Sequence, residues 1–141
     1  MNVLEKIVNQ QNSKLIYLNQ KYKIRKKIKC KSRFIKEIEK NNSQNKTSLI
    51  AEFKRFSPSV KEFKKVQSIR EVIKSYDKAN VTCISILTDK NFGGSINDIV
   101  IAKKYTNKPI IRKDFIVDPM QIYESALYEV DAILLIARIL T

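Results

Sequence analysis

Two lysines and a glutamate at the ends of apolar stretches are the residues of this chain best suited to acid–base chemistry. Glu52 and Lys54 end the stretch "SLIAEFK", and Lys113 ends "KPIIRK". Two ammonium groups that lie together with little water around them make one of the pair a better proton donor. A structural salt bridge between Glu52 and a lysine explains the same residues, and the pattern alone slightly favours that reading.

The absence of histidine narrows the chemistry further. It removes the commonest proton shuttle and the commonest metal ligand, so acid–base work falls to Lys, Asp, Glu, Tyr or Cys. The cysteines, Cys30 and Cys83, lie far apart without a C-x-x-C pair, and we expect no metal site and a reduced, cytoplasmic protein. No segment approaches the roughly 20 apolar residues of a membrane span, so we expect no membrane association.

Two loops hold further candidates for ligand binding. The stretch "SPS" at 57–59 can offer the Ser57 hydroxyl and backbone N–H groups to an anion, although a plain proline turn is the alternative. Phe92 and Phe115 can stack on an aromatic ligand or serve only as apolar plugs. The stretch "NFGGS" at 91–95 lacks the G-x-G-x-x-G spacing of a dinucleotide site, and no cofactor is expected.

These side chains need a scaffold, and the apolar patterning predicts a parallel α/β sheet. Strands that are apolar on both faces alternate with amphipathic helices, as in right-handed βαβ units. Ser68 and Glu71 predict a capping box, and Asp118 with Pro119 predicts an N-cap followed by a first-turn proline. The predicted strands cover 48–53, 81–87, 108–113 and 131–137, and the helices between them 68–79, 96–105 and 119–130.

The periodicity fits both an open doubly wound sheet and part of a (β/α)8 barrel. In either fold the chemistry lies at the carboxyl ends of the strands, where Glu52 and Lys54 end the first strand. The third strand runs into "IRKDFIV", in which Arg112, Lys113 and Asp114 interrupt an apolar sequence. We interpret these three charges as the mouth of the site.

Residues 1–47 are predicted to form a basic helical extension, and 48–141 the α/β unit. Apolar residues over 2–23 recur at helical spacing, and "RFIKEIEK" predicts a second, short helix. The chain has a net charge of +14, concentrated in residues 1–48 with 13 basic and 3 acidic side chains. This segment has few aromatic residues and no RRM, KH or zinc pattern, so we do not expect a nucleic-acid partner.

Three ordered stretches resemble the indole-3-glycerol-phosphate synthase family. "IAEFKRFSPS" is similar to its first-strand motif, "ISILTDKNFGGS" to its second strand and loop, and "PIIRKDFIVDPMQIYESALYEVDAILLIARIL" to its third strand through its fourth. The resemblance implies a (β/α)8 TIM-type barrel. This chain would be its N-terminal half-barrel of four parallel strands, preceded by the extra N-terminal helix of the family.

The resemblance also implies an activity: a cofactor-free carboxy-lyase of tryptophan biosynthesis. The family closes the indole ring of 1-(2-carboxyphenylamino)-1-deoxyribulose 5-phosphate, with loss of carbon dioxide and water, to give indole-3-glycerol phosphate. By matched motif, Lys113 is the general acid, Lys54 holds the anthranilate carboxylate and Glu52 orients the lysines. Ser57 helps to bind the phosphorylated substrate. The aromatic pocket would be lined by Phe92, Phe115 and Leu134.

A whole barrel takes roughly 250 residues, whereas this chain has 141. We therefore expect it to lack the family's general-base glutamate and phosphate-binding loops, and to be inactive alone. It would pair with a complementary C-terminal half or self-associate through open strand edges. The alternative is a non-enzymatic basic module that binds nucleic acid on a half-barrel scaffold.

Overall fold

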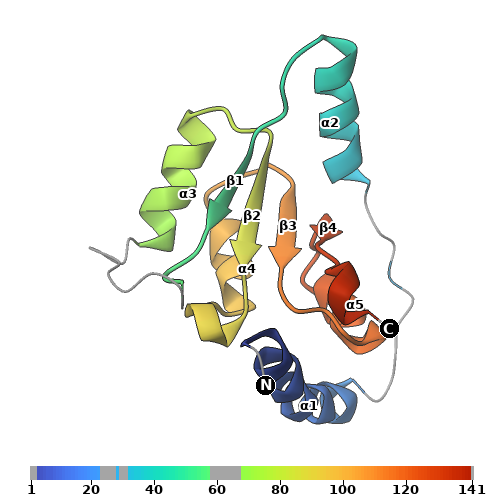
Figure 1. The fold of residues 1–141 in the computed structure, drawn as a ribbon. Helices are drawn as coiled ribbons and strands as arrows, with labels where there is room; N and C mark the ends of the chain where they lie inside the picture. The colour runs from blue at the N-terminus through green and yellow to red at the C-terminus, as the bar shows by residue number, and fades with distance from the viewer. Residues whose placement is uncertain (1–2, 23–27, 29–31, 58–67, 141) are drawn as a thin grey trace.

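A parallel sheet of four strands organises the computed structural model, which describes residues 3–22, 28, 32–57 and 68–140 (Figure 1). The strands lie side by side in chain order, each paired in parallel with the next. This confirms the half-barrel type of sheet predicted from the sequence. The strands are β1 (Ile50–Phe53), β2 (Cys83–Leu87), β3 (Ile110–Lys113) and β4 (Ala132–Ile133).

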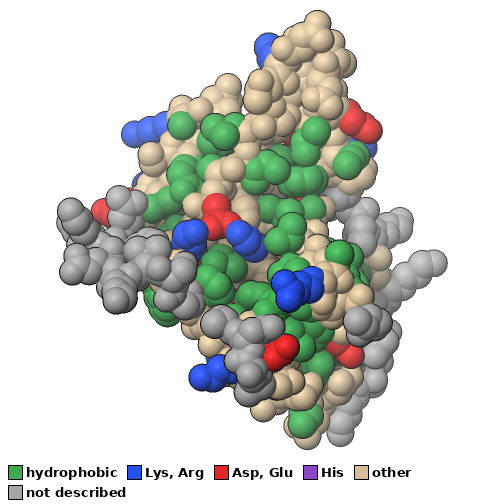
Figure 2. All heavy atoms as spheres, in the orientation of Figure 1, with side chains coloured by type: hydrophobic (Ala, Val, Ile, Leu, Met, Phe, Trp, Pro, Cys, Tyr) green, Lys and Arg blue, Asp and Glu red, His purple; other side chains and the backbone are tan. Residues whose placement is uncertain are grey.

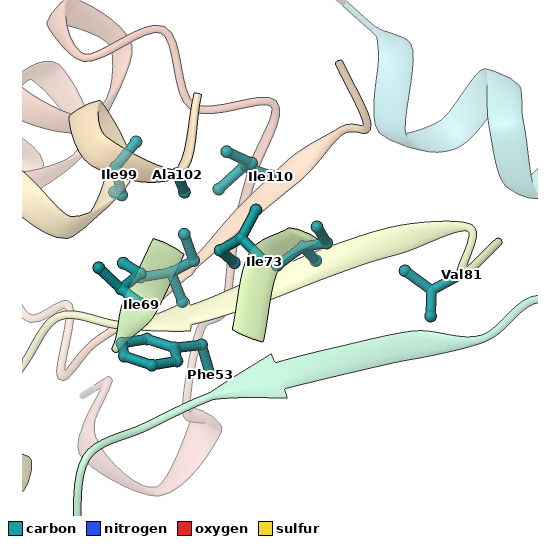
Figure 3. Packing of buried hydrophobic residues seen from close by; sticks show 9 residues of the cluster. Phe53, Ile69, Ile73, Val81, Ile99, Ala102 and Ile110 are labelled. Carbon is teal, nitrogen blue, oxygen red and sulfur yellow. The ribbon is translucent and has the colours of Figure 1, made fainter. Parts of the chain in front are cut away.

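Three helices connect successive strands: α3 (Ile69–Lys78), α4 (Asn97–Ala102) and α5 (Pro119–Leu127). Ile84 and Ile86 of β2 share one face of the sheet because strand side chains alternate. That face packs against α3 and α4 to form the hydrophobic core (Figure 3). Its buried members are Phe53, Ile69, Ile73, Val81, Ile84, Ile86, Ile99, Ala102 and Ile110.

One predicted helix start is confirmed in detail, and another only in part. Asp118 caps α5 by accepting a hydrogen bond from the Met120 N–H at 2.7 Å, and the Gln121 side chain completes a capping box. Ser68 is the N-cap of α3 but makes no side-chain cap hydrogen bond, so the predicted box with Glu71 is wrong. Both Ser68 and Glu71 are exposed, and water can satisfy the first N–H groups of α3 instead.

The last strand is much shorter than predicted. Only Ala132–Ile133 pairs with β3, whereas the apolar run predicted a strand over 131–137. A 3₁₀ helix, η2, follows at Ala137–Ile139, and another, η1, occupies Lys90–Phe92 within the loop after β2. A strand needs a hydrogen-bonding partner as well as apolar residues. Because β3 ends at Lys113, it offers β4 no partner over the rest of the predicted run.

Two helices precede the sheet, as predicted, and they lie at its opposite ends (Figure 1). Helix α1 (Val3–Lys21) lies by the carboxyl ends of the strands and contacts α5. Helix α2 (Arg33–Ser43) lies at the amino ends, where the Asn41 amide donates to Thr82 Oγ1 at 3.0 Å. The division into units 1–47 and 48–141 stays a prediction. Among the helices that the structure describes, none is long and apolar enough to cross a membrane.

Candidate active site at the carboxyl ends of the strands

Glu52 of β1 binds one lysine on each of its carboxylate oxygens. Lys113 at the end of β3 pairs with Oε2, and Lys54 lies 3.2 Å from Oε1. The first and third strands are separated by β2, so the long side chains of Glu52 and Lys113 reach across it. The predicted charge cluster therefore exists, and it lies at the carboxyl edge of the sheet. On the face shown in Figure 2, charged side chains gather among hydrophobic ones.

The electrostatics of the cluster favour a charged carboxylate. Burial raises the pKa of Glu52, but hydrogen bonds and charges from Lys113 and Lys54 outweigh it and hold this pKa below its usual value. The three side chains are partly exposed, 26% for Glu52 and 40% for each lysine. A ligand can therefore reach both ammonium groups without unfolding the cluster.

A cavity of about 100 Å³ opens beside this cluster. The rings of Phe92 and Phe115 stack there with centroids 6.2 Å apart and planes inclined by 24°. Such a cavity can hold a flat apolar group, with cationic side chains at one rim for an anionic substituent. Its lining comprises Glu52, Lys54, Leu87, Phe92, Lys113, Asp114, Phe115, Leu134 and Ile136.

Six of the seven residues predicted for the site line this cavity, and the seventh does not. Ser57 is half-buried in the loop after β1 and is absent from the lining. The other residues of "SPS", at 58–59, lie outside the described residues. A role for Ser57 in binding a ligand therefore stays a prediction.

A larger hollow of about 660 Å³ lies at the opposite end of the strands. It runs between α2 and the loops that precede β2 and β3, and it contains none of the predicted site residues. Parallel α/β folds carry their chemistry at the carboxyl ends of the strands, whereas the amino ends serve stability. The smaller cavity beside Glu52 is therefore the better candidate for an active site.

The interpretation of Arg112 as part of the site mouth is wrong. Its side chain is fully buried between the sheet and α5. The guanidinium donates to Ser125 Oγ at 2.9 Å and lies 3.0 Å from the Glu124 carboxylate, both in α5. Neighbouring residues of a strand point to opposite faces, so Arg112 turns away from the cluster that Lys113 joins. The charges in "IRKDFIV" therefore belong to two different sites: Arg112 pairs with α5, and Lys113 joins the cluster at Glu52.

Two residues of α1 that the sequence interpretation missed also contact this edge. The Gln11 amide donates to Asp89 Oδ2 at 3.1 Å, and Lys14 Nζ lies 2.9 Å from Asp114 Oδ2. A signal for them exists in the spacing: positions 11 and 14 fall at helical intervals between the buried residues Ile7 and Leu18. Polar side chains on the buried face of an amphipathic helix indicate a polar partner.

Comparison with known proteins points to one family. The family described as indole-3-glycerol phosphate synthase matches residues 3–141. The chain is similar to the indole-3-glycerol phosphate synthase of Petrotoga mobilis, with 41% identity over 139 residues, which cover 98% of this chain and 50% of that relative. The proteins of the same name from Caldanaerobacter subterraneus and Bacteroides thetaiotaomicron are 44% and 47% identical over 102 and 95 residues.

Coverage of the relatives is partial. The alignment with the Caldanaerobacter protein takes in 70% of this chain and 39% of that relative, and the Bacteroides alignment 67% and 36%. The chain thus spans half or less of the length of these three relatives. None of the three bears a name that supports the alternative of a nucleic-acid-binding module.

Proposed function

The chain belongs to the indole-3-glycerol phosphate synthase family, and from this premise we propose that its charge cluster and aromatic cavity form one part of the site for that reaction. The reaction converts 1-(2-carboxyphenylamino)-1-deoxyribulose 5-phosphate to indole-3-glycerol phosphate. The observation that carries the proposal is the meeting of Lys54 and Lys113 on Glu52, beside the stacked rings of the cavity.

Each part of the cluster has a task in this proposal. Lys113 donates a proton to the ketone oxygen of the substrate, which makes the ketone carbon a better electrophile for the aromatic ring. The ring carbon that bears the carboxylate attacks it, and carbon dioxide leaves from that ring carbon. The hydroxyl formed from the ketone oxygen then takes up a second proton and leaves as water, while the adjacent methylene carbon loses a proton to form the double bond of the indole. Lys54 attracts the carboxylate before it is lost, and Glu52 keeps both ammonium groups in place.

The apolar part of the cavity explains the choice of an aromatic substrate. Phe92 and Phe115 provide stacked rings, and Leu134 adds an aliphatic surface at the rim. Aromatic rings prefer such offset contacts, which contribute about 0.5–1.5 kcal/mol per pair beyond the area they bury. We assign the aryl group of the substrate to this surface, and to Ser57 a contact with the rest of the substrate.

Turnover also requires groups that this chain does not supply in the proposal. The resemblance assigns the general-base glutamate and the phosphate-binding loops to the other half of the barrel. The Petrotoga mobilis relative has a half that its alignment with this chain leaves uncovered. Joined to that half, the chain should make indole-3-glycerol phosphate, whereas neither part alone should do so.

The assay can follow the fluorescence of the indole product, and this chain itself contains no tryptophan that would add to the signal. A joined protein that folds and binds the substrate, yet forms no indole product, would contradict the proposed function. The separate halves, measured at the same concentration, are the controls for contaminating activity.

We also propose that the open edges of the sheet make the isolated chain self-associate. In the part of the chain that the structure describes, β1 and β4 each pair with one strand and leave the other side free. Apolar side chains at or just beyond these edges are exposed, 43% for Ile50 in β1 and 50% for Leu135, which follows β4. Unpaired strands beside exposed apolar side chains recruit other chains.

Sedimentation velocity at micromolar concentration should therefore show dimers or larger species. Leu135→Lys should reduce the association because it places a charge just after β4, next to its free edge. Ile16→Lys is the matched control, since Ile16 is 62% exposed but belongs to α1 and not to the sheet. A monodisperse monomer with cooperative unfolding would contradict the expectation.

A further inference from the structure

Helix α1 is joined to the candidate site by buried polar contacts. The Gln11 side chain is 3% exposed; it donates to Asp89 Oδ2 at 3.1 Å and accepts from the Gln121 amide at 3.4 Å. Lys14 Nζ lies 2.9 Å from Oδ2 of Asp114, which is 1% exposed. The helix therefore contacts the loop after β2, the end of β3 and helix α5.

Asp114 in turn holds the backbone that carries two cavity residues. Its Oδ1 accepts the Phe115 backbone N–H at 2.9 Å, and its Oδ2 accepts the Thr88 hydroxyl at 2.8 Å. The Thr88 backbone N–H donates to the Lys113 carbonyl oxygen at 2.9 Å. The carboxylate thus holds the backbone N–H of Phe115 directly and, through Thr88, the backbone carbonyl of Lys113.

The charges around Asp114 balance only when α1 is in place. Arg112 of β3 lies 2.7 Å from Asp114 but also pairs with Glu124 of α5. Lys14 supplies the second cation, so two positive groups face two carboxylates. Burial raises the pKa of Asp114, and the charges of Lys14 and Arg112 outweigh it and hold this pKa below its ordinary value.

We propose that Lys14 is a positioning residue of the candidate active site. By holding the Asp114 carboxylate charged and in place, it fixes the backbone from which Lys113 and Phe115 project into the cavity. The contact itself is a property of this chain; only its consequence for turnover rests on the proposed function.

The Phe115 amide is the probe for the contact, because its N–H donates directly to Asp114. The chain has six phenylalanines, so ¹⁵N-Phe labelling of the full chain gives few signals, and Phe115→Leu identifies the one required. Its chemical shift should titrate with Asp114, at a midpoint below the ordinary pKa of an aspartate.

Lys14→Met should shift this midpoint to higher pH, because a cation near a carboxylate stabilises the charged form and its loss favours the protonated one. Lys14→Arg should restore the original midpoint. Lys14→Gln, which keeps polarity without charge, should behave like the methionine variant and serves if that variant fails to fold. Lys6→Met removes an exposed lysine from the same helix and should change nothing.

The consequence for turnover is measured in the chain joined to the uncovered Petrotoga mobilis half. Lys14→Met should lower kcat by roughly 10-fold or more with a smaller change in KM, since misplacement of a reacting group by 1 Å costs about 10²-fold. Lys14→Arg should restore kcat.

Two results would overturn the proposal. An unchanged Phe115 midpoint in Lys14→Met would show that Lys14 does not hold Asp114. A shifted midpoint with unchanged kcat would show that the contact is structural and does not position the site. If the unsubstituted joined protein makes no product, the proposed function fails, and the amide titration still decides whether α1 fixes Asp114.

Discussion

Lys113→Ala is expected to reduce the turnover of the joined barrel by roughly 10²–10⁴-fold, the usual contribution of a positioned general acid. Lys113 ends β3, pairs with Glu52 and lines the cavity. The substitution removes the proposed proton donor from a position that water cannot fill with the same orientation. The fold should persist, because the Lys113 side chain is 40% exposed and lies outside the core formed with α3 and α4.

The measurement is kcat for formation of the indole product, with the far-ultraviolet circular dichroism of each variant as a check on folding. Lys108→Ala is the matched control: it lies just before β3, at the amino end, where it lines the larger hollow. Turnover of Lys113→Ala that stays within a few-fold of the unsubstituted protein would remove Lys113 from the role of acid. Loss in both variants alike would point to damage of the strand and not to chemistry.

The sheet could be predicted from the sequence because local pattern and global fold agree there. The stretches that contain β2 and β3 are apolar on both faces, and helical periodicity separates them, which leaves few topologies other than a parallel sheet. The polar residues at strand ends then locate the candidate site without any coordinates. Glu52 and Lys113 illustrate this, since each lies near the carboxyl end of its own strand and their side chains form an ion pair.

Adjacent charges on one strand show where the sequence interpretation failed. Arg112, Lys113 and Asp114 were treated as one group, although alternation along a strand sends neighbours to opposite faces. Applied to each residue, that rule separates Arg112, which faces α5, from Lys113, which faces the cavity. Which partner meets Arg112 depends on tertiary packing, so the ion pair with Glu124 has no local signal.

The contribution of α1 was hidden for a different reason. Gln11 and Lys14 are polar residues in a helix with a polar face, and only their spacing from Ile7 and Leu18 shows that they belong to the buried face. Their partners Asp89 and Asp114 lie 78 and 100 residues away in the sequence. Contacts at such separation follow from the fold and cannot be read from a single sequence.

Arg112→Met should lower the free energy of unfolding by about 3–5 kcal/mol, the usual cost of removing one partner from a buried ion pair. Its side chain is 0% exposed, 2.7 Å from Asp114 and 3.0 Å from Glu124. Methionine fills most of the space but leaves Glu124, 5% exposed at its side chain, without this cation. A loss of that size is a large fraction of the 5–15 kcal/mol that typically stabilises a domain.

A double variant separates the charge from the packing. If the cost arises from an unpaired buried carboxylate, Arg112→Met with Glu124→Gln should be more stable than Arg112→Met alone, because the second change removes that charge. Urea unfolding at one fixed protein concentration measures both, since the proposed self-association would make stability depend on concentration. Arg138→Met, at an exposed position of η2, is the control and should change stability by less than about 0.5 kcal/mol. Equal losses in the single and double variants would assign the effect to packing of the arginine stem against α5 and not to its charge.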